Sequence, residues 1–186
     1  MSERPRTTGA RLASRGADVV LVTAREMRLL LGLLLVLFLT SETWRYIGRL
    51  SVPRFVLLVV ITVIVALLVV GLGLRHTIGS PAVKRAVGRV AGEVLAFGAA
   101  LFLVFVAIGV LSVDADLVRE WTGEPAAVLV SLGLGRPPMV LSAPLLQVGG
   151  FLASFGALAF AVEVVTDAST RQLLVGDLVE PPELAV

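Results

Sequence analysis

The sequence predicts an all-α membrane protein, with four transmembrane helices and a small extracytoplasmic β-hairpin or loop between helices 3 and 4. Three observations predict this class. The 186 residues are 57% hydrophobic and 16% charged, with a mean hydropathy of +0.96, whereas soluble domains are about 45–50% apolar and about 25% charged. The apolar residues gather in runs of about 20, the length that crosses a hydrocarbon core of about 30 Å. Basic residues flank these runs.

The predicted spans cover residues 28–44, 55–74, 93–113 and 143–165. The second is an uncharged run of Val, Ile, Leu and Phe with few small residues, which favours a lipid-facing helix. The first is the shortest: the run from Leu29 to Trp44 gives about 24 Å of helix at 1.5 Å per residue. Trp44 and Tyr46 suit a membrane interface. A cleaved signal peptide and an interfacial or re-entrant segment remain alternatives for this run.

The predicted domain organisation has three parts: a disordered basic arm over residues 1–16, a four-helix transmembrane domain over 17–176 and an acidic tail over 177–186. Fifteen of the 16 basic residues are Arg, which is typical of a high-GC bacterial coding sequence. With four spans, eleven basic residues fall in the N-terminal segment, the 75–93 loop and the tail, against five in the other two loops. The positive-inside rule therefore predicts a bacterial cytoplasmic membrane protein with both termini in the cytoplasm. If the first segment does not span, the counts are again eleven and five, so the positive-inside rule does not distinguish three spans from four.

Helix signals extend the third span. Ser80 and Pro81 are a cap and a first-turn proline, so we expect about 33 continuous helical residues ending near Val113. Lys84, Arg85 and Arg89 lie on its cytoplasmic part and are predicted contacts for lipid headgroups.

The 114–142 loop is predicted to contain a short helix capped by Asp114. Two apolar runs, Ala127–Leu132 and Met139–Leu141, then flank a Gly- and Pro-rich turn and predict a β-hairpin. A re-entrant helix over 126–134 is the alternative. Ser142 is predicted to cap the last span.

Beyond the last span, the helix is expected to continue to about Val175. Asp167 and Arg171 would form an (i, i+4) pair on that helix.

Small residues recur every four positions in two spans: Gly92, Ala96 and Ala100 in the third, and Gly149, Ala153 and Ala157 in the fourth. Such stripes let helices approach closely in lipid. Both spans are therefore predicted to pack tightly, with each other, with a second copy of the chain or with another membrane protein.

The chain offers little site chemistry. It has no Cys and one His, so we predict no metal and no cofactor, and no ionisable residue lies in the middle of a span. Gln147, the one strongly polar side chain within a span, predicts an intramembrane polar contact. We expect a protein that is not an enzyme, has an accessory, structural or partner-binding role, and contacts membrane lipids but no nucleic acid.

Two other functions remain open at this point. One is a small oligomeric channel or transporter lined by Gln147, Ser154 and Thr62. The weaker alternative is a membrane enzyme that acts on lipid through Asp114 and Asp116.

Three sequence features carry a resemblance to a family: the segment Thr43-Trp44-Arg45-Tyr46 before the second span, the hairpin with Ser142 opening the last span, and Val165-Thr166-Asp167 at its end. With these features the chain resembles uncharacterised small integral membrane proteins of actinobacteria. The resemblance implies no activity and no site residue.

Overall fold

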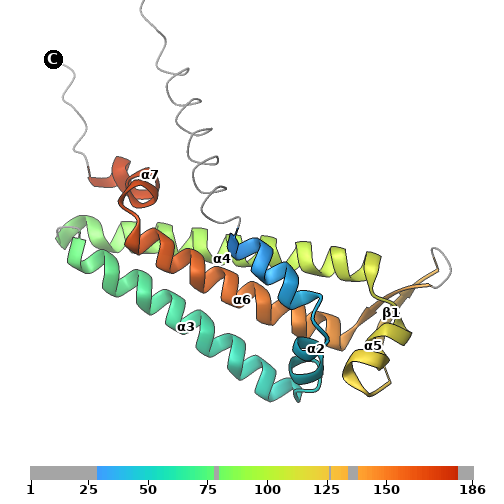
Figure 1. Ribbon diagram of the computed structural model, residues 1–186. Coiled ribbons are helices and arrows are strands. Elements are labelled where there is room, and N and C mark those ends of the chain that lie inside the picture. Colours follow the sequence, from blue (N-terminus) through green and yellow to red (C-terminus); the bar gives the residue numbers. More distant parts are fainter. Residues whose placement is uncertain (1–28, 78–79, 126, 134–137, 180–186) are drawn as a thin grey trace, which may run out of the picture.

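The computed structural model describes residues 29–77, 80–125, 127–133 and 138–179 (Figure 1). The predicted arm over residues 1–16 lies outside the described residues. Three helices are long and apolar enough to cross a membrane. They are α3 (Val52–Thr77), α4 (Ser80–Ser112) and α6 (Ala143–Thr166). They contain most of the second, third and fourth predicted spans, and α4 has the predicted 33 residues.

Helix α6 is the centre of the bundle and lies between α3 and α4 (Figure 1). Of its most apolar stretch 56% is buried inside the protein, against 17% for α3 and 22% for α4. The small side chains of α6 explain this position, because they let both neighbours approach its backbone. The large apolar side chains of α3 point mostly outward, as its sequence predicted.

The close contacts between helices occur at glycines. A Cβ atom on Gly98 of α4 would lie 3.0 Å from the Cβ of Ala157 on α6. A Cβ atom on Gly73 of α3 would meet the side chain of Val165. Dispersion contacts of this kind hold helices together in lipid, where the hydrophobic effect between helices is weak.

The first predicted span, 28–44, is not one straight helix. A helix over Leu29–Phe38 ends, and α2 (Ser41–Ile47) follows it after a bend of 70°. If each bent pair counts as one span, the described residues contain up to four spans. Beyond the bend, the Trp44 side chain is fully buried in the protein, whereas Tyr46, the other residue predicted to suit a membrane interface, is 69% exposed.

The bend is stabilised by side chains that satisfy backbone groups freed by the break. Thr40 has an extended conformation, and its Oγ1 donates to the carbonyl of Val36 at 2.6 Å. The indole Nε1 of Trp44 donates to the carbonyl of Phe38 at 2.6 Å. In lipid an unpaired carbonyl would cost several kcal/mol, so these two bonds allow the helix to break here.

A short helix and a hairpin follow α4. Helix α5 (Ala115–Thr122) is capped by Asp114, whose carboxylate accepts from the Leu117 N–H at 2.8 Å. Strands β1 (Val128–Leu132) and β2 (Met139–Ser142) pair antiparallel. The predicted hairpin is thus confirmed, and the alternative of a re-entrant helix over 126–134 is wrong. As predicted, Ser142 caps α6 by accepting from the Leu145 N–H at 3.4 Å.

The helix after the last span was predicted to continue to Val175, but α6 ends at Thr166 and α7 (Ala168–Val179) begins after Asp167. Asp167 does not pair with Arg171. Its carboxylate accepts from the Thr170 N–H at 2.7 Å and from the Ser169 hydroxyl at 2.6 Å, which turns the chain into α7.

Helix α7 packs against α4 and α6 (Figure 1). Arg171 donates to the carbonyl of Val165 at 2.7 Å. Val175 is buried in the same cluster as Ala86 and Val90 of α4. The helix continues to Val179, into the segment predicted as the acidic tail.

We expect Asp167→Ala to loosen α7, because the cap is lost. Amide hydrogens of α7 should exchange several-fold faster than in the wild type, measured by hydrogen exchange with mass spectrometry. Glu163→Gln, a charge removal one turn earlier with no side-chain bond among the described residues, should leave the rate unchanged. Equal rates in wild type and Asp167→Ala would contradict the capping role.

The same cap predicts a pH dependence. Hydrogen bonds from the side chains of Ser169 and Thr170 hold the pKa of Asp167 well below its ordinary value of 3.8. A lowered pKa stabilises the fold above the unfolded-state value, and this contribution is lost as the pH falls toward the folded-state value. The difference in melting temperature between wild type and Asp167→Ala should therefore be constant above about pH 5 and shrink below about pH 4. A constant difference down to about pH 2 would contradict it.

Candidate functional site

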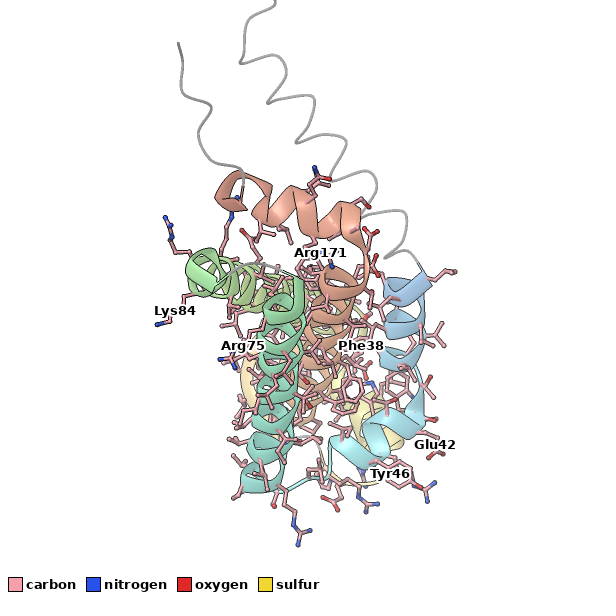
Figure 2. All side chains as sticks on the ribbon, turned by 90° about the vertical axis from the view of Figure 1, so that its left-hand side faces the viewer. Phe38, Glu42, Tyr46, Arg75, Lys84 and Arg171 are labelled. Atoms are coloured by element: carbon pink, nitrogen blue, oxygen red, sulfur yellow. The ribbon has the colours of Figure 1, made fainter. Side chains whose placement is uncertain are left out.

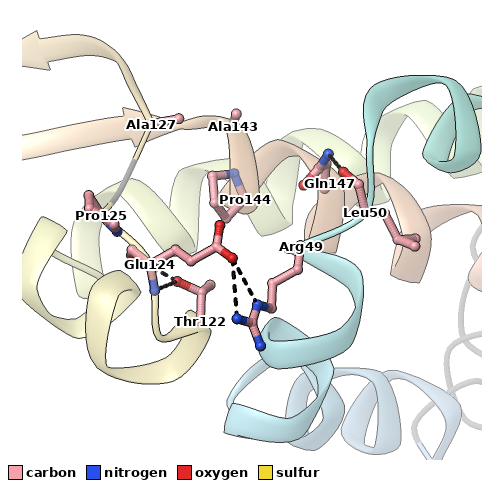
Figure 3. Close-up of a pocket in the computed structure, with 10 residues that line it drawn as sticks. Arg49, Leu50, Thr122, Glu124, Pro125, Ala127, Ala143, Pro144 and Gln147 are labelled. Carbon is pink, nitrogen blue, oxygen red and sulfur yellow. Dashed lines mark hydrogen bonds and ion pairs between the residues drawn. The ribbon is translucent and has the colours of Figure 1, made fainter.

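A polar cavity of about 210 Å³ lies at the hairpin end of the bundle (Figure 3). Three parts of the chain form it: the connection between α2 and α3, the end of α5, and the junction of the hairpin with α6. The lining residues are Gly48, Arg49, Leu50, Thr122, Glu124, Pro125, Ala127, Ala143, Pro144 and Gln147. We call this cavity the polar notch.

The charged groups of the notch are Arg49 and Glu124, which are 75 positions apart in the sequence. The guanidinium Nε and Nη2 atoms both donate to the same carboxylate oxygen, Oε1, at 3.3 and 3.2 Å. The two side chains are 45% and 62% exposed. An exposed pair of this kind contributes at most about 1 kcal/mol to stability, so its principal effect is to hold both charges at the rim.

A tight turn positions Glu124. Helix α5 ends at Thr122 and is followed by Gly123, whose φ of 73° is the left-handed conformation that favours glycine. The Thr122 hydroxyl donates to the carbonyl of Val118 at 2.8 Å and accepts from the Glu124 N–H at 3.3 Å. The turn therefore points the Glu124 carboxylate back toward α2 and Arg49 (Figure 3).

Gln147 lies in the second turn of α6 and is only 8% exposed. Its Nε2 donates to the carbonyl of Leu50 at 2.9 Å, which ties α6 to the connection between α2 and α3 (Figure 3). The sequence singled out Gln147 as an intramembrane polar contact. The structure gives it a backbone partner at the end of the bundle.

We expect Gln147→Leu to lower the free energy of unfolding by about 1–2 kcal/mol, because the Leu50 carbonyl loses its donor. The midpoint of SDS-induced unfolding in detergent micelles measures this loss. Gln172→Leu is the matched control, since Gln172 is exposed on α7. Equal midpoints for Gln147→Leu and the control would contradict the role assigned to the bond.

The predicted headgroup contacts lie at the opposite end of the bundle. Lys84, Arg85 and Arg89 are all exposed on α4, and Arg75 at the end of α3 is exposed as well. In Figure 2 the side chains of Arg75 and Lys84 point away from the helices. We call these four residues the basic end.

The two predicted stripes of small residues lie in different environments: the stripe on α6 is buried, and the stripe on α4 is exposed. Gly149, Ala153 and Ala157 are buried on α6. On α4, Gly92, Ala96 and Ala100 are all exposed, and a Cβ atom on Gly92 would have no neighbour within 4 Å. The contact with α6 uses a different face of α4, which carries Gly98, Leu101, Phe105 and Gly109.

Of the three polar residues considered for a pore, Gln147 bonds the Leu50 carbonyl, and the other two are satisfied within their own helices. The Thr62 hydroxyl donates to the carbonyl of Leu58 at 2.9 Å, and the Ser154 hydroxyl donates to that of Phe151 at 2.7 Å. Of the two acidic residues considered for lipid chemistry, Asp114 is the cap of α5 and Asp116 is exposed.

Among the described residues, no three His, Cys, Asp or Glu side chains are grouped so that they could hold a metal ion. Comparisons of the chain with family models, with curated proteins and with solved structures give no match.

Proposed function

We propose that the chain is a four-span protein of the bacterial cytoplasmic membrane with a non-catalytic, accessory role, and that it associates through α4 with a second copy or with another membrane protein. In this proposal the bent pair of Leu29–Phe38 and α2 is the first span. Its support is the packing of Leu34 and Phe38 in the same core as α4 and α6. A bent span is acceptable in lipid because the freed carbonyls are paired.

The proposed orientation places both termini in the cytoplasm. Its support is the charge distribution along the sequence: with four spans, eleven of the 16 basic residues fall in the N-terminal segment, the 75–93 loop and the tail. The hairpin and the polar notch then face outward. Each exposed Lys or Arg of the basic end would gain about 1 kcal/mol near an anionic lipid surface.

The observation that carries the proposed association is that the two opposite faces of α4 differ in packing. One face packs on α6, and the opposite face presents Gly92, Ala96 and Ala100 with no covering element among the described residues. Leu95, Leu103 and Val104 are 48%, 65% and 50% exposed on the same helix. A second helix could approach the α4 backbone closely along the three small residues and pack against the larger side chains beside them.

Photo-crosslinking in membranes tests this proposal. A photoactivatable residue at Ala96 should give a discrete crosslinked product of reproducible composition, and Gly92→Leu should abolish it by filling the groove. The matched controls are the same probe at Gly71 of α3 and the variant Gly71→Leu, because a Cβ atom on Gly71 also has no neighbour within 4 Å. Equal crosslinking from Ala96 and Gly71, or none from Ala96, would count against association through α4.

A further inference from the structure

We propose that the polar notch binds a phospholipid headgroup that carries both a phosphate and a primary ammonium group, as in phosphatidylethanolamine. The inference rests on membrane insertion, which the proposed function also requires, but it does not depend on the α4 face.

The position of the notch matches the depth of headgroups. Arg49 and Leu50 directly precede α3, which begins at Val52, and Gln147 lies in the second turn of α6. The notch is therefore at the level where two spanning helices enter the membrane. Tyr46, 69% exposed on the neighbouring α2, belongs to the residue type that is enriched at this level.

The charges of the notch match a zwitterion. Glu124 uses only Oε1 in the ion pair, and Arg49 uses Nε and Nη2. Carboxylate Oε2 and guanidinium Nη1 thus have no hydrogen bond to another described residue. A guanidinium suits phosphate oxygens, and a carboxylate suits the N–H donors of an ammonium group.

The same pair disfavours other ligands. A simple anion on Arg49 would also meet the negative charge of Glu124, and a simple cation on Glu124 would meet Arg49. A quaternary ammonium group, as in phosphatidylcholine, has no N–H to donate to Oε2. The notch therefore selects for a primary ammonium together with a phosphate.

The size of the notch is sufficient for this group. A volume of 210 Å³ equals that of about seven liquid waters at about 30 Å³ each. The phosphoethanolamine group has about eight non-hydrogen atoms, a number comparable to that of the waters the notch can hold. Beyond Leu50, α3 begins with the exposed apolar side chains of Val52 and Val56, beside which acyl chains can enter the bilayer.

Native mass spectrometry of the full chain in nanodiscs tests the proposal. The discs contain equal amounts of phosphatidylethanolamine, phosphatidylcholine and phosphatidylglycerol. We expect the wild type to retain phosphatidylethanolamine at least several-fold over the other two lipids. Glu124→Gln should remove the preference over phosphatidylcholine, and Arg49→Gln should remove retention at the notch. Both side chains are substantially exposed, so the variants are expected to fold, which circular dichroism checks.

The chain offers a matched control pair. Arg45 and Glu42 form a similar exposed ion pair on α2, with Nη1 and Oε1 3.6 Å apart, and neither residue lines the notch. Arg45→Gln and Glu42→Gln should leave the lipid preference intact. Equal losses from the two pairs would overturn the proposal, as would a wild type that enters nanodiscs and shows no preference. A chain that fails to enter nanodiscs would instead contradict the membrane assignment itself.

Soluble competitors distinguish a lipid headgroup from free phosphate as the ligand of the polar notch. Millimolar glycerophosphoethanolamine should displace retained lipid only weakly, because it lacks acyl chains. Displacement by inorganic phosphate alone at the same concentration would show that the ammonium group is not recognised, and would overturn the proposal.

Discussion

Trp44→Ala is expected to lower the free energy of unfolding by about 3–5 kcal/mol, the usual cost of truncating a buried Trp. Trp44 is fully buried, and its ring packs against Phe38 and Trp121 with centroids 5.6 and 5.4 Å apart. The substitution removes these contacts and leaves the Phe38 carbonyl at the bend without its donor. Circular dichroism during SDS-induced unfolding measures the loss.

Trp44→Phe isolates the hydrogen bond, because the phenyl ring keeps part of the packing but cannot donate. We expect a smaller loss of about 1–3 kcal/mol. Trp121→Phe is the control, since no hydrogen bond of its indole to another described residue is present. If Trp44→Phe were no more destabilising than Trp121→Phe, the indole bond would not stabilise the bend.

Gly156→Leu is expected to lower the free energy of unfolding by about 1–3 kcal/mol through overpacking. A Cβ atom at this position would meet the Leu101 side chain of α4 and would lie 3.3 Å from Leu34 of the first helix. The new side chain must therefore separate α6 from two neighbours at once. The midpoint of SDS-induced unfolding is again the measurement.

Gly71→Leu is the matched control for Gly156→Leu. It makes the same exchange in a spanning helix where a Cβ atom has no neighbour within 4 Å, and it gains helix propensity. We expect an unchanged or slightly raised stability. If both variants lost the same stability, the effect would come from the loss of glycine itself and not from close packing around α6.

The sequence was sufficient for the elements that local composition determines. Uncharged runs of about 20 residues predict a span whatever surrounds them, which is why α3, α4 and α6 were found. The length of α4 followed from Ser80 and Pro81 at its beginning, and the hairpin followed from two apolar runs around a turn.

The breaks in helices were not predictable in this way. The bend after Phe38 depends on Trp44 reaching back to a carbonyl, whereas the leucine-rich run that precedes the break favours a continuing helix. Asp167 can pair with Arg171 one turn later or cap a new helix, and the burial of Val175 against α4 favours the second outcome. In both cases a tertiary contact outweighs local helix propensity.

Which face of α4 packs on α6, and which residues line the polar notch, also depend on tertiary contacts. Helix α4 carries small residues on two faces, and no feature of its sequence indicates that Gly98 contacts α6 while Ala96 is exposed. In the notch, the sequence identified only Gln147. Arg49 and Glu124 were missed because their pairing joins positions 75 residues apart and leaves no local pattern.

We propose that the bent first segment spans the membrane, so that the hairpin end and the N-terminus lie on opposite sides. The chain has no Cys, so single cysteines at Ser2, Ser131 and Ser169 can be labelled in intact cells with a membrane-impermeant maleimide. Ser131 and Ser169 are both exposed. We expect labelling at Ser131 and protection at Ser2 and Ser169 until the cells are lysed. Protection at both Ser2 and Ser131, with labelling at Ser169, would contradict it.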